Sequence, residues 1–155
     1  MSLRIVLAAL HLIALGIGLG AIYSRARALN RLRDGAAVGA VFAADNGWGI
    51  AAVLWIVTGL WRAMGGFEKA PSYYWSNHVF YAKMGFLVVI LLLEIWPMST
   101  LIRWRIAARR GPLVLSPAQV TSARRLARVS DVQTLLILCM VVAAVMMARG
   151  YGVRG

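Results

Sequence analysis

The stretch Val79 to Trp96, VFYAKMGFLVVILLLEIW, decides the fold of this chain. It is long and apolar enough to cross a bilayer as a helix, which takes about 20 residues at roughly 1.5 Å each. Lys83 and Glu94 interrupt it, and their spacing of eleven residues puts them within about 20° of one helix face. Because a charge in hydrocarbon is costly, this face must turn toward other helices, so the stretch predicts a bundle.

The composition of the whole chain supports a membrane protein. Its 155 residues are 61% hydrophobic, and the mean hydropathy of +0.75 is too high for a soluble domain. Three further apolar segments accompany the first. Asp34-Gly35 is a turn signal, Gly111-Pro112 is a break, and Ser116-Pro117 is a helix start. We predict an all-α integral membrane four-helix bundle in one domain, 1–155, with helices over about 3–33, 36–63, 77–108 and 117–149. Pro97 should kink or end the third helix.

The basic residues predict the orientation of the bundle. The net charge is +12, and the arginines gather in the segments after the first helix, from Arg25 to Arg33, and after the third, from Arg103 to Arg128. The positive-inside rule places these two loops in the cytoplasm and both termini outside, in the periplasm, for a multi-pass protein of the cell's inner membrane. The lipid bilayer is the expected partner, a homo-oligomer or a membrane complex stays open, and nucleic acid is not expected.

Four charged residues are predicted to lie near the cytoplasmic boundary of the membrane: Asp45, Glu94, Asp131 and Arg128. We interpret them as structural intramembrane charges, because three carboxylates beside loop arginines can form ion pairs that hold the helices in register. A proton or cation relay is the alternative interpretation.

His11 and Lys83 are predicted to lie at similar depths in the outer half of the membrane, about 9 Å and 6 Å in. The small residues on the histidine's helix face suit either a flat ring cofactor such as haem or close helix packing. We predict that both side chains line one cavity, walled by Ala8, Ala14, Gly18 and Phe80. A hydrogen-bonded core histidine and a lysine that extends to the interface are the alternatives. No metal site is predicted, and the CxxCH, HExxH, GxGxxG and Walker motifs are absent.

A polar and aromatic segment, residues 67–78, precedes the third helix and suits a membrane interface. Together with its neighbours it resembles a bacterial four-helix membrane family, domain of unknown function 2214. The matching residues are Leu10-His11-Leu12, Thr58-Gly59, Arg62, Phe67, Lys69, Tyr73-Tyr74, Asn77, Phe80, Lys83, Pro97, Trp104 and Arg105. The chain departs from the family at His78, where a proline is usual. The resemblance implies a fold and a membrane location, with Arg62, Lys69, Tyr73, Tyr74 and Asn77 in an interface loop.

A helix-1 histidine with a helix-3 lysine is also similar, more distantly, to HemJ-type protoporphyrinogen oxidases and CopD-like membrane proteins. That likeness implies a haem b ligand in His11 and a partner in Lys83. The first functional hypothesis is therefore a haem b-binding redox or porphyrin-handling protein. The alternatives are a non-catalytic membrane subunit or scaffold, and a small transporter in which Lys83 and Glu94 line a path. The sequence does not decide whether the chain is an enzyme.

Overall fold

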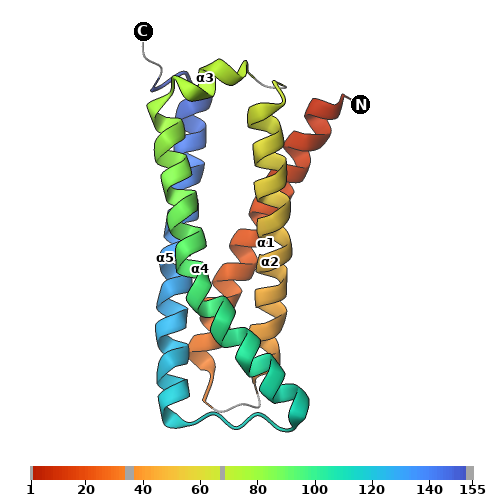
Figure 1. The fold of residues 1–155 in the computed structure, drawn as a ribbon, viewed down its shortest axis with the longest axis vertical. Helices are drawn as coiled ribbons and strands as arrows, with labels where there is room; N and C mark the ends of the chain where they lie inside the picture. The colour runs from red at the N-terminus through yellow and green to blue at the C-terminus, as the bar shows by residue number, and fades with distance from the viewer. Residues whose placement is uncertain (1, 34–36, 67–68, 153–155) are drawn as a thin grey trace.

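The computed structural model describes residues 2–33, 37–66 and 69–152, and this part of the chain is helical throughout apart from its connections. The long helices are α1 (Leu3–Arg31), α2 (Val38–Met64), α4 (His78–Arg110) and α5 (Pro117–Ala148). A short helix, α3 (Pro71–Trp75), lies between α2 and α4 (Figure 1). Each long helix is long and apolar enough to cross a membrane. The predicted all-α membrane bundle is confirmed.

The two termini and α3 lie at one end of the bundle, which we call the terminal end (Figure 1). The end of α1, the start of α2 and the α4–α5 connection lie at the opposite end, the loop end. Helix α1 packs along α2 and α5, and α4 packs along α5 before crossing toward α2 at the loop end. Which end faces the cytoplasm stays a prediction from the arginines.

The helix boundaries follow local signals in the sequence, with one difference at residues 71–75. Ser116 caps α5 in a reciprocal capping box with Gln119, as the Ser-Pro start indicates. Pro97 does not end α4, which continues through it to Arg110 and bends near its middle (Figure 1). Residues 71–75, expected as part of an interface loop, form α3 with a proline in its first turn. The Asp34-Gly35 turn lies outside the described residues.

Two apolar clusters fill the bundle at different levels. The loop-end core contains Leu29, Val41, Leu101, Trp104 and Leu126. The central core contains Trp48, Trp55, Ile90, Ile137 and Met140. Because lipid tails are as apolar as these side chains, the two clusters stabilise the bundle through close van der Waals packing. The polar side chains described below lie between the two cores and beyond the central one.

Candidate functional site

A fully buried arginine lies where all four long helices meet. The Arg25 side chain on α1 has 0% of its surface exposed. An arginine has five N–H donors, and here each has an acceptor. Nε donates to Ser130 Oγ (3.1 Å), Nη1 to Asp45 Oδ1 (2.9 Å) and Glu94 Oε1 (2.6 Å), and Nη2 to Glu94 Oε2 (2.9 Å) and Gln133 Oε1 (3.0 Å). We call these five residues, with Arg105, the central charge network.

The network extends to Arg105 through a shared carboxylate. The second oxygen of Asp45 accepts from Arg105 Nη2 at 2.9 Å. Gln133 Nε2 donates to Glu94 Oε2 at 2.8 Å and to the Ile90 carbonyl at 3.1 Å. Two arginines thus face two carboxylates, and the formal charges balance. Removing one partner of such a pair strands the other in the interior, so the network ties the four helices to one register.

The predicted structural charges fall into two groups. Asp45 and Glu94 lie in the central charge network, but their main partner is Arg25, which the sequence analysis assigned to a cytoplasmic loop. Asp131 and Arg128 lie on the exposed side of α5, and neither forms an ion pair with another described residue. Their predicted pairing is therefore wrong for the part of the chain that the structure describes.

The sequence contains a pattern that identifies Arg25 as a buried residue. The buried residues of α1 recur every three or four positions, through Ala14, Gly18, Ile22, Arg25 and Leu29. This spacing is the stripe of one helix face. Arg25 continues the stripe, whereas Arg27, two positions later, is exposed. Periodicity thus separates the buried arginine from the loop arginines, although the positive-inside count treats them alike.

At the terminal end, a hydrogen bond holds the ring of His11. Its Nδ1 lies 3.0 Å from Thr58 Oγ1 on α2. The Thr58 hydroxyl donates to the Leu54 carbonyl at 2.6 Å, so its oxygen is left to accept from the ring. In the neutral imidazole this assigns the proton to Nδ1 and the lone pair to Nε2. The ring also stacks on Trp55, with 5.9 Å between the centroids.

Two basic side chains lie near this histidine. The charges of Lys83 on α4 and Arg62 on α2 both act on the His11 ring, and Arg62 also acts on Lys83. We call these three residues the terminal basic group. Lys83 is half-buried, and no described carboxylate lies within ion-pair distance of it. The group combines an imidazole lone pair with two cations contributed by different helices.

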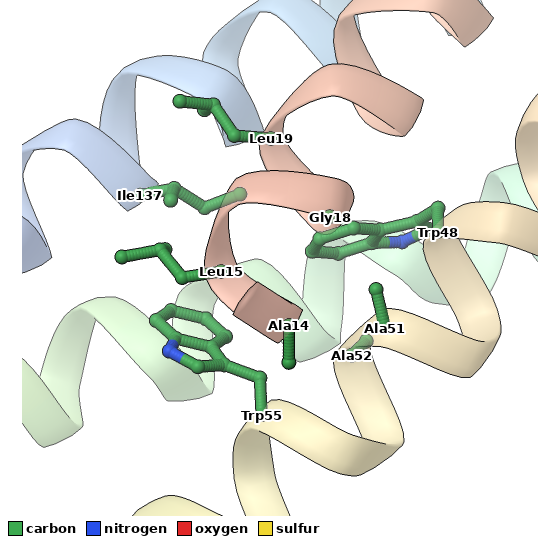
Figure 2. Close-up of a pocket in the computed structure, with 9 residues that line it drawn as sticks. All are labelled: Ala14, Leu15, Gly18, Leu19, Trp48, Ala51, Ala52, Trp55 and Ile137. Carbon is green, nitrogen blue, oxygen red and sulfur yellow. The ribbon is translucent and has the colours of Figure 1, made fainter. Parts of the chain in front are cut away.

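The small residues on α1 pack against tryptophans of α2. Figure 2 shows Ala14 and Gly18 facing Trp48 and Trp55. A Cβ on Gly18 would come 3.4 Å from Ala51 Cβ and 3.5 Å from the Trp48 ring. The crevice that these residues line has essentially no space for a water molecule. The sequence suggested that these small residues serve either a ring cofactor or close helix packing. The structure shows close helix packing, and Ala14 and Gly18 line no cavity beside His11.

The predicted interface loop fastens the terminal end. Tyr73 donates from its hydroxyl to the Met147 carbonyl at 2.7 Å. Asn77, fully buried, caps α4 by accepting from the backbone N–H groups of Val79 and Phe80, and its Nδ2 donates to the Tyr151 carbonyl at 2.9 Å. These bonds join the start of α4 to the end of α5.

The other residues of this segment lie nearby. Lys69 Nζ lies 3.8 Å from the centre of the Tyr73 ring, and Tyr74 stacks at a tilt on Phe80. The backbone N–H of His78 donates to Gly152 at 2.9 Å, and its side chain is exposed. Among the described residues, no three His, Cys, Asp or Glu side chains converge as a metal site would require.

Comparison with known proteins gives one match. Residues 3–152 match the model of a family described as predicted membrane protein, DUF2214. No curated protein and no solved structure matches the chain significantly. The likeness to HemJ-type and CopD-like proteins therefore stays a prediction from two residues.

Proposed function

The chain belongs to the DUF2214 family of predicted membrane proteins, and we propose that it binds haem b at the terminal basic group. The observation that carries this proposal is the hydrogen bond from His11 Nδ1 to Thr58, which leaves the lone pair on Nε2 to bind a metal. Histidines that ligate metals commonly donate their other N–H in this way, which fixes the tautomer and the ring. A single histidine suffices for haem, because the porphyrin supplies the remaining in-plane ligands.

The charges near His11 also favour haem b. A haem carries two carboxylates, and guanidinium and ammonium groups are the side chains that pair with carboxylates. Lys83 is close enough for its charge to act on His11. Trp48 and Trp55 fill the contact between α1 and α2, so this contact has no room for a haem ring. Bound haem would supply one-electron redox chemistry.

Haemin titration of the purified protein tests the proposal. We expect a shifted Soret band for the wild type and loss of this shift in His11→Ala. Thr58→Val keeps the shape of its side chain but removes the acceptor, so it should weaken haemin binding about tenfold or more. His78→Ala is the matched control, because the His78 side chain is exposed. Equal haemin affinity in the wild type and in His11→Ala would refute the proposal.

A second candidate function is a non-catalytic membrane subunit or scaffold. The central charge network favours it, because the network satisfies its charges within one chain and needs no ligand. The absence of a haemin-dependent spectrum, together with a protein partner that co-purifies in stoichiometric amount, would favour this candidate. A transport path from Lys83 to Glu94 has less support, since Phe86, Leu87 and Ile90 of the central core lie between them.

We further propose that the protein resides in the inner membrane with its terminal end in the periplasm. The support is the arginine-rich loop end, which the positive-inside rule assigns to the cytoplasm. In this orientation a ligand of the terminal basic group would lie in the periplasmic half of the bilayer.

A further inference from the structure

A groove between α2 and α4 lies beside the central charge network on the outside of the bundle. It has a volume of about 460 Å³, and it is lined by Asp45, Asn46, Gly49, Ile50, Ile102 and Arg105. Gly49 opens the groove, since a Cβ on this residue would have no neighbour within 4 Å. The terminal basic group lies at the other end of the bundle, so this groove is a separate feature.

The groove changes from polar to apolar along the bundle axis. Helix α2 starts at the loop end and α4 finishes there, so Asp45, Asn46 and Arg105 lie nearer that end. Gly49, Ile50 and Ile102 lie farther along, toward the middle of the bundle. Exposed arginines on the last turns of α4, such as Arg103 and Arg109, indicate that the loop end reaches the membrane surface. The polar end of the groove therefore faces the headgroups and its apolar end faces the acyl chains.

Arg105 has donors to spare in this groove. Three of its N–H groups donate to Asn46 Oδ1 (2.8 Å), the Phe42 carbonyl (3.1 Å) and Asp45 Oδ2 (2.9 Å). Among the described residues, the Nε–H and the second Nη1–H have no acceptor. The side chain is 27% exposed, and its guanidinium lies 4.8 Å above the Phe42 ring. Arg105 is thus a positioned cation with two free donors.

The charge around the groove is suited to an anion. The Asp45 carboxylate, which would repel one, already accepts from Arg25 and Arg105 with its two oxygens. Arg109, one helical turn after Arg105 on the same face of α4, is exposed and adds positive charge beside the groove. Basic sites between membrane helices near the surface are typical sites for anionic lipid headgroups.

We propose that the groove binds one anionic phospholipid, with its phosphate at Arg105 and an acyl chain along Gly49, Ile50 and Ile102. The phosphate accepts from the two free N–H groups of Arg105, and the apolar wall accommodates the chain that follows. This site is independent of haem binding at the terminal end.

Native mass spectrometry of the detergent-released protein tests the proposal. Gly49→Leu should fill the groove and leave its charged residues unchanged, and Gly85→Leu is its matched control, because a Cβ on Gly85 also meets open space. We expect the wild type and Gly85→Leu to retain one phosphatidylglycerol molecule. Gly49→Leu should bind phosphatidylglycerol with an affinity at least about tenfold lower. Phosphatidylglycerol should raise the Tm of the wild type, whereas phosphatidylcholine or inorganic phosphate should not.

A second pair of variants covers the case in which Gly49→Leu does not fold. Ile102→Trp narrows the groove from α4, and Ile106→Trp is its control, since both isoleucines are 48% exposed and only Ile102 lines the groove. Phosphatidylglycerol binding should fall in the first variant and persist in the second. Equal binding within either pair of folded variants would overturn the proposal, as would equal stabilisation by phosphatidylcholine.

Discussion

The substitution Arg25→Lys tests whether the central charge network depends on the guanidinium or only on a positive charge. Lysine keeps the charge and offers three N–H donors in place of five. At Arg25 each of the five donors has an acceptor, and no water can replace a lost bond because the side chain is fully buried. We therefore expect a large loss of stability although the net charge does not change.

The magnitude follows from the bonds that lysine cannot make. At least two of the five hydrogen bonds must go, and a bond to a charged group contributes roughly 1.5–3 kcal/mol. The free energy of unfolding should fall by about 3 kcal/mol. Arg105→Lys is the matched control, since that side chain is 27% exposed. Water can take over its bonds, and the loss should be about 1 kcal/mol or less.

Unfolding by SDS in lipid–detergent micelles provides the measurement. The signal is tryptophan fluorescence, which reports on the buried Trp48 and Trp55 of the central core. Both variants are compared with the wild type in micelles that contain no anionic lipid, because Arg105→Lys would also change phospholipid binding in the groove. Equal losses for Arg25→Lys and Arg105→Lys would refute the argument, because a network that needs only charge would treat the two positions alike.

Three further predictions address other parts of the structure. Glu94→Gln should lower the free energy of unfolding by about 3 kcal/mol, because it leaves Arg25 without its bidentate partner. Asp131→Asn, at an exposed position on α5, should change this free energy by less than about 0.5 kcal/mol. SDS titration measures both changes, and equal effects would contradict the placement of Glu94 in the central charge network and of Asp131 outside it. Gly152→Ala should loosen the terminal end and speed amide hydrogen exchange at the start of α4. The φ angle of Gly152 is +86°, and a Cβ there would come 2.7 Å from Asn77 Oδ1. An unchanged exchange rate would argue against this contact. Cysteine labelling in a Cys139→Ala background tests the orientation. A cysteine at Ala70 should react with an impermeant thiol reagent in intact cells, whereas a cysteine at Val114, where the native residue is 83% exposed, should not. The reverse labelling pattern would show that the orientation is inverted.

The membrane fold could be predicted from the sequence because each helix carries its own signal. Hydropathy marked the four spans, and the spacing of Lys83 and Glu94 marked the inward face of α4, where Ile90, Pro97 and Leu101 are buried. Local chemistry also marked the start of α5. These features depend on residues near each other in the chain, which is why one sequence suffices to find them.

The pairing of charges could not be predicted in the same way, because it depends on which helix faces lie together. Arg25 and Arg27 carry the same charge in the same segment, but only Arg25 lies on the buried stripe. Asp131 and Gln133 lie only two residues apart on α5, yet the Gln133 amide reaches Arg25 while the Asp131 side chain is exposed. The small residues of α1 could have faced a cofactor or a neighbouring helix. They pack against the tryptophans of α2, which the sequence of α1 alone does not indicate.

The connectivity of Arg25 has a consequence for biosynthesis. Its partners follow it by 20 residues in α2, by 69 in α4, and by 105 and 108 in α5. Until the ribosome has made α4 and α5, the first helix carries a cation that has only its Asp45 acceptor. The nascent chain must therefore keep this side chain at the headgroups or in contact with the insertion machinery until the last helix arrives. A chain truncated before α5 keeps both carboxylates but lacks Ser130 and Gln133, so two N–H groups of Arg25 would have no acceptor in the interior of the incomplete bundle.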